Sequence, residues 1–592
     1  MIDKNIQLKA QEWLSQSYDQ KTRNEIKSLM DSNNKKELTD RFYKELDFGT
    51  GGLRGVLGAG TNRMNIYTVG KMAQGLANYL LKTDPGSKDK GLVIAYDSRN
   101  MSTDFSLRSA LIFGANGIRC YLFKSLRSTP MLSFAIRHLK AISGLVITAS
   151  HNPREYNGIK VYYEDGAQVL PPHDQGIIDE VRAIRSVDEI KLITENQAIK
   201  AGLLTYLDDD VDEAYYQKVL GLSIHPEIIK EVQDRVKIVF TPLHGTGNIP
   251  VREVLERAGF NHVAVVPEQE KPDGNFPTVD YPNPEESAAL KLAIDLAKST
   301  SSQLVLASDP DADRVGIAVN NGRNEFVLFN GNQVGVILTY YILSQYKALN
   351  RLPKNGLIVK TIVTTDLSNT MCRDFGVEME EVLTGFKYIA GKVHQYHDID
   401  GKSKEYLFGF EESYGYNMGD FVRDKDAVSS CLLIAELTAW CTKHNMTLLD
   451  YLDQIYEQYG YYLESLDSIR LKGKEGLEKI QGILKDFRNH PPQDIGGSQV
   501  VRIRDVLTGQ MIDLSSHRES KINLPRSNVI TYYLANGGKV TLRPSGTEPK
   551  IKFYFSYFHR DETKALEEVK VSVKNDLDHL QKSFMAMVQA KL

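Results

Sequence analysis

The chain repeatedly places a short apolar run directly before a cluster of polar residues. The run at 92–95 precedes a polar cluster at 96–99, the run at 145–147 precedes Ser150, and the same order returns at 236–240, 304–307 and 356–359. Helical patterns such as 107–113 lie between these pairs. This alternation is typical of α/β units, and it puts each polar cluster beyond the carboxyl end of a strand, where open α/β sheets bind ligands.

The length of 592 residues predicts roughly three to five domains, because a single hydrophobic core stops growing well below that size. The opening segment reads as one or two amphipathic surface helices. Near the C-terminus, alternating apolar residues at 551–557 predict a half-buried strand in an α+β domain, and a helix should follow it. We expect boundaries near residues 210, 325 and 463.

The composition is that of an ordinary globular protein, with 42% hydrophobic and 25% charged residues. A net charge of -4 offers no general basic field for nucleic acid or anionic membranes. The four cysteines are too scattered for a disulfide framework or a zinc site. With neither a leader nor an apolar stretch long enough to cross a membrane, the expected location is the cytoplasm.

Ser150 is the first candidate for chemistry. It follows an apolar strand and precedes His151-Asn152-Pro153, which would present its hydroxyl at the strand tip beside backbone N–H groups. A polar turn without chemistry is the alternative for this segment taken alone.

Asp309, Asp311 and Asp313 alternate in one short string. In extended backbone their carboxylates project to one side and converge on a hard cation, with magnesium the natural choice. An EF-hand loop is rejected, because its sixth and twelfth positions would be Arg314 and Asn320 instead of Gly and Glu.

Two further clusters suit a phosphorylated sugar. Residues 543–550 supply the guanidinium of Arg543, two hydroxyls and a glycine, which is a composition for a phosphate cradle. Residues 409–415 place two acids and a hydroxyl between glycines, which suits hydrogen bonds with sugar hydroxyls. A tight turn and a solvated acidic loop remain the respective alternatives. Lys160 and Lys425 are candidates for moving a proton, provided that they are buried.

These four clusters, in this order, resemble the α-D-phosphohexomutase family. The resemblance rests on Thr148-Ala149-Ser150-His151-Asn152-Pro153, the string 309–314, Glu411-Glu412-Ser413 and Arg543-Pro544-Ser545-Gly546-Thr547. Segments 49–55, 96–99 and 384–387 support it. The N-terminal helical stretch and the sequence of residues 48–55 resemble the longer subgroup, which contains phosphoglucomutases and phosphopentomutases.

The resemblance implies four domains around a central cleft. Three would be related α/β units, at 1–210 with the phosphoserine loop, 211–325 with the metal loop and 326–463 with the sugar loop. The last, at 464–592, would be an α+β domain like the TATA-binding protein and would carry the phosphate-binding loop.

The resemblance also implies roles for individual residues. Ser150 would be the phosphoserine, its phosphate joining Asp309, Asp311 and Asp313 as a magnesium ligand. The other catalytic residues implied are Arg54, His151, Lys160 and Lys425. The substrate-binding residues implied are Glu411, Ser413, Thr384, Gly385, Lys387, Arg314, Arg543, Ser545, Gly546 and Thr547. One branch of the family has a histidine after the sugar loop where this chain has Tyr414-Gly415-Tyr416, which leaves the acid and base open.

The activity implied is phosphoryl transfer between Ser150 and a hexose monophosphate, with glucose 1,6-bisphosphate as intermediate and activator. Glucose phosphate is the expected substrate, and mannose and pentose phosphates are alternatives within the family. A metal-dependent phosphatase would use the same nucleophile and metal, whereas a haloacid-dehalogenase-type enzyme would need Thr in place of Asp313. A binding protein with a degenerate site is disfavoured, because every cluster is intact. The expected partners are small sugar phosphates, for a monomer or weak homo-oligomer.

Overall fold

The computed structural model describes residues 3–32, 34–46, 51–471, 473–544 and 550–592. The chain forms two compact units, which are described separately. The first unit contains residues 1–329, 390–402 and 413–444, and the second contains 330–389, 403–412 and 445–592.

The first sheet of the first unit has the strand order β1-β5-β4-β2-β3-β6. Strands β4, β2, β3 and β6 are parallel, whereas β5 is antiparallel to both of its neighbours, β4 and the edge strand β1. The strands are β1 (Gly52–Val56), β2 (Leu92–Tyr96), β3 (Cys120–Phe123), β4 (Ser143–Ile147), β5 (Tyr156–Tyr163) and β6 (Leu204–Leu207).

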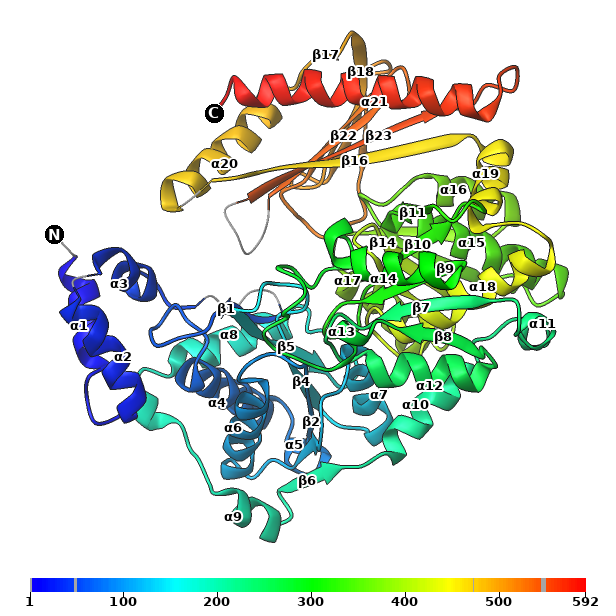
Figure 1. The fold of residues 1–592 in the computed structure, drawn as a ribbon. Helices are drawn as coiled ribbons and strands as arrows, with labels where there is room; N and C mark the ends of the chain where they lie inside the picture. The colour runs from blue at the N-terminus through cyan, green and yellow to red at the C-terminus, as the bar shows by residue number, and fades with distance from the viewer. Residues whose placement is uncertain (1–2, 33, 47–50, 472, 545–549) are drawn as a thin grey trace. The chain divides into compact units, whose positions relative to one another are not determined.

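Helices cover both faces of this sheet, with α4 and α6 on one face and α7 on the other (Figure 1). Because both faces are covered, β2 and β4 are buried at every position. The helices of this region are α4 (Ile66–Thr83), α5 (Ser87–Lys90), α6 (Ser102–Ala115), α7 (Thr129–Leu139), α8 (His173–Ala183), the 3-10 helix η1 (Val187–Glu189) and α9 (Glu195–Lys200).

The second sheet of the first unit has the order β11-β10-β9-β7-β8. Strands β9, β7 and β8 are parallel, and β10 is antiparallel to both of its neighbours, β9 and the edge strand β11. The strands are β7 (Lys237–Thr241), β8 (His262–Val265), β9 (Leu304–Ser308), β10 (Val315–Asn320) and β11 (Phe326–Phe329). The other elements of this part are α10 (Asp210–Leu220), α11 (Pro226–Val232), α12 (Asn248–Ala258), α13 (Pro267–Glu270), α14 (Ser287–Thr300), the π-helix η2 (His394–Ile399), β15 (Gly415–Asn417) and α18 (Ala427–Lys443).

The two sheets share one plan, which bears on function. In each, a buried parallel strand leads through a polar loop into an antiparallel neighbour, as β4 leads to β5 and β9 to β10. The first loop contains Ser150 and the second contains Asp309, Asp311 and Asp313. The predicted strand-then-cluster order is therefore confirmed at both places.

The N-terminal segment forms three helices, not the one or two predicted. They are α1 (Lys4–Glu12), α2 (Gln20–Asp31) and α3 (Lys35–Phe42). Asp19 and Asn34 accept backbone N–H groups at the starts of α2 and α3, so each short helix has its own cap. Trp13 is buried among Tyr18 and Phe42, whereas Leu8 is 63% exposed. The three helices thus share a small aromatic core with Tyr67 of α4.

The second unit begins with a parallel sheet in which β13, β12 and β14 lie side by side in that order. The strands are β12 (Gly356–Thr361), β13 (Glu378–Val382) and β14 (Glu405–Glu411). The helices here are α15 (Gly331–Ala348), α16 (Leu367–Phe375) and α19 (Leu448–Tyr459), and α17 (Phe386–Val393) passes from the second unit into the first.

The C-terminal sheet is antiparallel throughout, in the order β16-β23-β22-β21-β18-β19-β20, with β17 paired to β18. Helices α20 and α21 pack on one face of it (Figure 1). The elements are β16 (Tyr461–Arg470), α20 (Gly473–Asn489), β17 (Asp494–Ile495), β18 (Ser498–Asp505), β19 (Gln510–Asp513), β20 (Arg518–Lys521), β21 (Ile530–Leu534), β22 (Lys539–Pro544), β23 (Lys550–His559) and α21 (Leu566–Gln589).

This domain is α+β as predicted, but β23 is not half-buried. Tyr554 and Ser556, on the face expected to be solvated, are 7% and 8% exposed. Tyr554 packs in a second cluster with Ile362 and Leu383, so both faces of the middle of the strand are covered.

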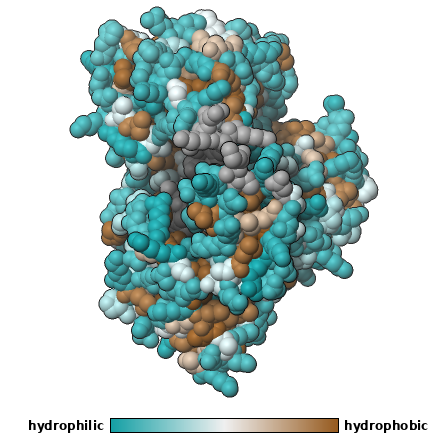
Figure 2. Space-filling model, turned by 90° about the vertical axis from the view of Figure 1, so that its left-hand side faces the viewer, coloured by the Kyte–Doolittle hydropathy of each residue, from teal (hydrophilic) through white to brown (hydrophobic). Residues whose placement is uncertain are grey.

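Among the described residues, none of the helices is both long and apolar enough to cross a membrane. The face of the molecule in Figure 2 is mainly hydrophilic, with hydrophobic residues scattered in small groups.

Candidate active site

The loop after β4 holds Ser150 in an unusual backbone conformation. Its φ of +52° lies in the left-handed region, which residues with a side chain seldom adopt. The Thr148 hydroxyl accepts the Ser150 N–H at 2.8 Å. The Ser150 hydroxyl donates to Asp309 Oδ2 at 2.7 Å and lies 3.1 Å from His151 Nδ1. The loop therefore aims the hydroxyl at the acidic string.

The acidic string converges through a turn and not through extended backbone, which corrects the sequence interpretation. Asp309 O accepts the Ala312 N–H at 2.9 Å, and Ala312 has a φ of +51°. Asp309 Oδ1 accepts the N–H groups of Asp313 and Arg314 at 3.1 and 3.0 Å. The turn brings one oxygen of each carboxylate to within 4.8 Å of the others.

Two lysines offset the charge of the three aspartates. Lys160 Nζ, on β5, donates to Asp311 Oδ2 at 2.6 Å and to Asp313 Oδ2 at 2.7 Å. Lys425 Nζ lies 3.2 Å from Asp313 Oδ2. The side chain of Lys160 is 13% exposed and that of Lys425 is 12% exposed, so these ion pairs are shielded from water.

The carboxyls differ in their preference for charge. Burial raises the pKa of Asp309 well above its usual value, and Asp311 and Asp313 raise it further. For Asp313, burial also acts to raise the pKa, but Lys160 and Lys425 outweigh it and lower the pKa. Asp309, which accepts the serine hydroxyl, is thus the carboxylate with least compensation from protein cations.

The three aspartates fit a divalent cation. One carboxylate oxygen from each lies within 4.8 Å of the others, and the three residues are at most 1% exposed. Asp311 Oδ1 and Asp313 Oδ1 are buried without a hydrogen-bond partner. Unpaired carboxylate oxygens are costly in a protein interior, and a hard cation is the partner that would satisfy them.

The remaining predicted residues of the first unit surround this centre. Burial, with Arg314 and Arg54, lowers the pKa of His151 well below its usual value, so the ring stays neutral at neutral pH. Arg54, on β1, donates to Asn152 Oδ1 at 3.1 Å and so reaches the Ser150 loop. Arg314 pairs with Glu285. Ser413 precedes Tyr414, whose carbonyl accepts the Val315 N–H at 3.1 Å beside the metal loop.

Two contacts of this centre escaped the sequence interpretation. Thr129 donates its hydroxyl to Asp311 Oδ2 at 2.7 Å and its N–H to Asp311 O at 2.9 Å. Tyr162 donates to Asp424 Oδ2 at 2.6 Å, and Asp424 Oδ1 lies 3.1 Å from Lys425 Nζ. The available signal for Thr129 was Ser128-Thr129-Pro130, which reads as the start of a helix.

The second unit holds the other predicted substrate residues. Glu411 ends β14 and is 4% exposed, and Lys387 lies 9% exposed on α17. Gly385 has a φ of +119°, and the hydroxyl of Thr384 is buried without a partner. Arg543, on β22, lies 3.5 Å from the hydroxyl of Tyr554. The predicted cradle residues Ser545, Gly546 and Thr547 lie outside the described residues.

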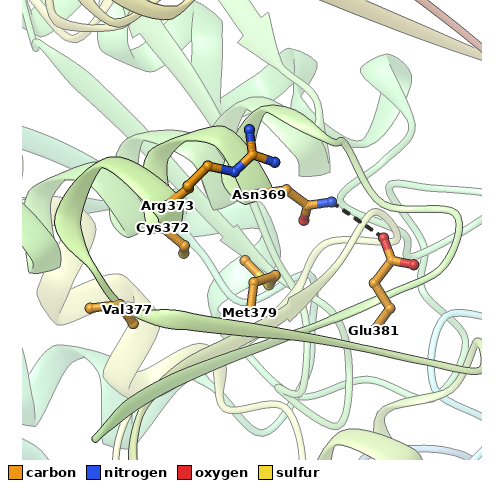
Figure 3. Close-up of a pocket in the computed structure, with 6 residues that line it drawn as sticks. All are labelled: Asn369, Cys372, Arg373, Val377, Met379 and Glu381. Atoms are coloured by element: carbon orange, nitrogen blue, oxygen red, sulfur yellow. Dashed lines mark hydrogen bonds between the residues drawn. The ribbon is translucent and has the colours of Figure 1, made fainter. Parts of the chain in front are cut away.

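A cavity of about 560 Å³ lies between α16 and β13 in the second unit (Figure 3). The Asn369 side chain donates to Glu381 at its edge, at 3.4 Å. The cavity is lined by Asn369, Cys372, Arg373, Val377, Met379 and Glu381. None of the predicted site residues is in this lining.

Three segments of the chain match a known family. Residues 45–188, 213–322 and 330–459 match, in order, the alpha/beta/alpha domains I, II and III of phosphoglucomutase/phosphomannomutase. The chain is 37% identical to a phosphoglucomutase of Staphylococcus saprophyticus over 90% of this chain and 94% of that protein. It is 39% identical to a Staphylococcus aureus phosphoglucomutase, over 88% of this chain and 91% of that protein.

Solved structures show the same fold at lower identity. Parafusin from Paramecium, a phosphoglucomutase, superposes with a TM-score of 0.66 at 18% identity, covering 92% of this chain and 96% of its own. A phosphoglucomutase/phosphomannomutase family protein from Burkholderia thailandensis has a TM-score of 0.61 at 16% identity, covering 92% and 97%. The family domains and the long curated matches identify an isomerase that transfers a phosphoryl group. The chain belongs to the phosphoglucomutase/phosphomannomutase family.

Proposed function

We propose that this enzyme interconverts glucose 1-phosphate and glucose 6-phosphate through a phosphoserine at Ser150 and a glucose 1,6-bisphosphate intermediate. The observation that carries the proposal is the hydrogen bond of 2.7 Å from Ser150 Oγ to Asp309, within a buried group of three aspartates and two lysines. The long similarity to curated phosphoglucomutases supports glucose phosphate as the substrate.

Two lysines beside the serine are the residues that we propose to assist the transfer. Phosphorylated Ser150 would face the free hydroxyl of the sugar monophosphate, and transfer needs in-line positioning with compensation of the moving charge. Lys160 and Lys425 bring positive charge to within 3.2 Å of the carboxylates around the serine. They are the candidates for stabilising the phosphoryl oxygens and for exchanging a proton with the sugar hydroxyl.

Magnesium is the proposed cation, held by Asp309, Asp311, Asp313 and an oxygen of the serine phosphate. When bound there, it would compensate the charge of a phosphoserine, roughly -1.5 to -2, next to three carboxylates. The two unpaired buried carboxylate oxygens support this assignment.

The second unit would bind the rest of the sugar phosphate. Glu411, with Ser413 of the first unit, would accept hydrogen bonds from sugar hydroxyls, and Arg543 with Ser545, Gly546 and Thr547 would hold the phosphate that is not transferred. Thr384, Gly385 and Lys387 would complete this side. We also propose that the chain divides into four domains, with boundaries near residues 210, 325 and 463.

Mannose and pentose phosphates are alternative substrates within the family, and a phosphatase is the alternative class. The test is to supply glucose 1-phosphate with magnesium and trace glucose 1,6-bisphosphate, and to measure glucose 6-phosphate and free phosphate together. We expect glucose 6-phosphate in large excess over free phosphate. Free phosphate without the isomer would contradict the proposal, and a higher kcat/KM with mannose or ribose 1-phosphate would reassign the sugar.

A further inference from the structure

The polar cluster at 96–99 has no role in the function proposed above, yet Arg99 lies at the centre of the Ser150 loop. Its side chain is fully buried just after β2. One terminal nitrogen donates to the carbonyls of Ser150 and Asn152. The other donates to the carbonyls of Pro153 and Tyr156, at 2.9 and 3.0 Å. A single guanidinium thus binds four backbone carbonyls of the loop that carries the serine.

The loop needs such support because its backbone is strained at the reactive residue. The left-handed region is unfavourable for a non-glycine residue, which persists there only where surrounding contacts hold it. Ser150 has a φ of +52°, and its own carbonyl is one of the four that Arg99 binds. The guanidinium therefore acts on the peptide unit whose conformation sets the direction of the serine hydroxyl.

Arg99 is itself held firmly in place. Asp97 Oδ2 lies 3.4 Å from Arg99 Nε, and Asp97 Oδ1 accepts the Arg99 N–H at 2.9 Å. The ring centroid of Phe276 lies 4.9 Å from the guanidinium carbon, a cation–π contact. Phe276 is 2% exposed, so the guanidinium is enclosed between a carboxylate, a ring and the four carbonyls.

We propose that Arg99 is a positioning residue for phosphoryl transfer, fixing the Ser150 backbone so that Oγ stays aligned with Asp309. This inference rests on the proposed function of Ser150. Arg99 makes its bonds through backbone carbonyls, so it acts through the serine and not on the substrate. A displacement of about 1 Å in a reacting group can cost about 100-fold in rate, which sets the scale of the expected effect.

Arg99→Lys is the informative substitution. A lysine keeps the charge opposite Asp97, but its single ammonium group cannot reproduce the planar fork that serves four carbonyls. We expect kcat to fall about 100-fold while KM for glucose 1-phosphate changes less than about 3-fold. Single-turnover phosphorylation of Ser150 by glucose 1,6-bisphosphate should slow by the same factor as kcat.

Arg108→Lys is the matched control, because Arg108 lies in the same part of the chain and donates to the carbonyl of Ile66, away from the loop. Its kcat should equal that of the wild type. A purely structural role would instead lower the melting temperature of Arg99→Lys and leave kcat unchanged below that temperature. A folded Arg99→Lys enzyme with wild-type kcat would overturn the inference.

Phe276→Leu is the second test variant, to be used if Arg99→Lys does not fold. It removes the ring beside the guanidinium and leaves every hydrogen bond of Arg99 possible, so we expect a smaller fall of kcat, about 5-fold, with unchanged KM. Wild-type kcat in a folded Phe276→Leu enzyme would then overturn the inference. If the wild type makes no glucose 6-phosphate, the proposed function is wrong, and the inference about Arg99 is wrong with it.

Discussion

Each unit of the molecule contains a cluster of carboxylates and cations, but the clusters are built differently. In the first unit, three aspartates converge, and two of their buried oxygens, Asp311 Oδ1 and Asp313 Oδ1, have no hydrogen-bond partner. In the second unit, Asp366 and Glu381 lie among Lys360, Lys539 and Arg504. There every carboxylate oxygen of these two residues is paired.

In the second cluster, positive and negative side chains alternate along a chain of ion pairs. Lys360 Nζ binds Asp366 Oδ1 at 3.0 Å and Glu381 Oε1 at 3.1 Å. Lys539 binds the other oxygen of Asp366, and Arg504 the other oxygen of Glu381, both at 2.7 Å. Burial acts to raise the pKa of Glu381, but Lys360 and Arg504 outweigh it and lower the pKa to about 2. This cluster joins the parallel sheet to the C-terminal sheet within the second unit.

The difference separates a reactive charge cluster from a structural one. A satisfied network contributes to folding and has no oxygen left for a ligand, whereas convergent like charges destabilise the fold and attract a cation. Stability and activity should therefore respond in opposite ways when each cluster is disturbed.

Neutralising the convergent cluster should have the largest effect. Asp309→Asn keeps acceptors for the N–H groups of Asp313 and Arg314 but removes a charge that burial disfavours. We expect kcat to fall about 1,000-fold, or about 4 kcal/mol, in the presence of magnesium. Without divalent ions, the melting temperature should equal or exceed that of the wild type. Steady-state kinetics and calorimetry measure the two effects. Asp295→Asn, at an exposed ion pair, is the control. A large loss of stability in Asp309→Asn would contradict the contrast.

Disturbing the alternating cluster should show the opposite response. Glu381→Gln leaves Lys360 and Arg504 without one shared carboxylate. Because the Lys360 side chain is fully buried, the loss of this partner should cost about 3 kcal/mol of unfolding free energy. Below the melting temperature, kcat should stay within about 3-fold of the wild type. Glu378→Gln, on the same strand but 53% exposed, should change neither quantity. A Glu381→Gln enzyme with wild-type stability would show that the network is dispensable.

Metal binding should act on the first cluster. Removal of divalent ions by a chelator should abolish activity, and magnesium should restore it. At about 100 times its dissociation constant, magnesium should add about 2.7 kcal/mol to the unfolding free energy of the wild type. The same titration on Asp309→Asn should give a much smaller shift of melting temperature. Equal stabilisation of both proteins would place the metal elsewhere.

Glu464 offers the smallest effect, through pH. Burial raises the pKa of this carboxyl from 4.5 to about 7, and its Oε1 has no hydrogen-bond partner. A carboxyl that binds its proton more tightly when folded lowers the unfolding free energy as pH rises from its unfolded to its folded pKa. Glu464→Gln should therefore stabilise the protein at pH 8 by on the order of 2 kcal/mol and have little effect at pH 4.5. Stabilisation that does not vary with pH would contradict this.

Local patterns were enough to predict the strands that carry the site. The apolar runs before Ser150 and Asp309 became β4 and β9, because buried parallel strands need continuous apolar residues. Each cluster follows the carboxyl end of its strand, where open α/β sheets bind ligands. The strands belong to different sheets, and the hydrogen bond from Ser150 to Asp309 joins the two clusters. The convergence of the aspartates was predicted, but the turn at Ala312 was not, because a left-handed alanine leaves no sequence signal.

Contacts between distant residues were beyond sequence patterns. Thr129 and Asp311 lie 182 positions apart in the sequence. Arg99 binds the carbonyl of Ser150, which lies on a different loop. No sequence pattern marks Lys360 or Glu381, because charged residues are usually exposed and neither lies in a motif. Their roles depend on tertiary packing, which buries Lys360 and places it beside Glu381.

The most direct test of the account is to find the residue that carries the phosphoryl group. The enzyme should be incubated with glucose 1,6-bisphosphate labelled with radioactive phosphate, freed of ligand, digested and analysed by mass spectrometry. We predict label on the peptide at Ser150, its complete transfer to sugar phosphate when unlabelled glucose 1-phosphate is added, and no label in Ser150→Ala. Label on another residue, or a Ser150→Ala enzyme with wild-type turnover, would contradict the account.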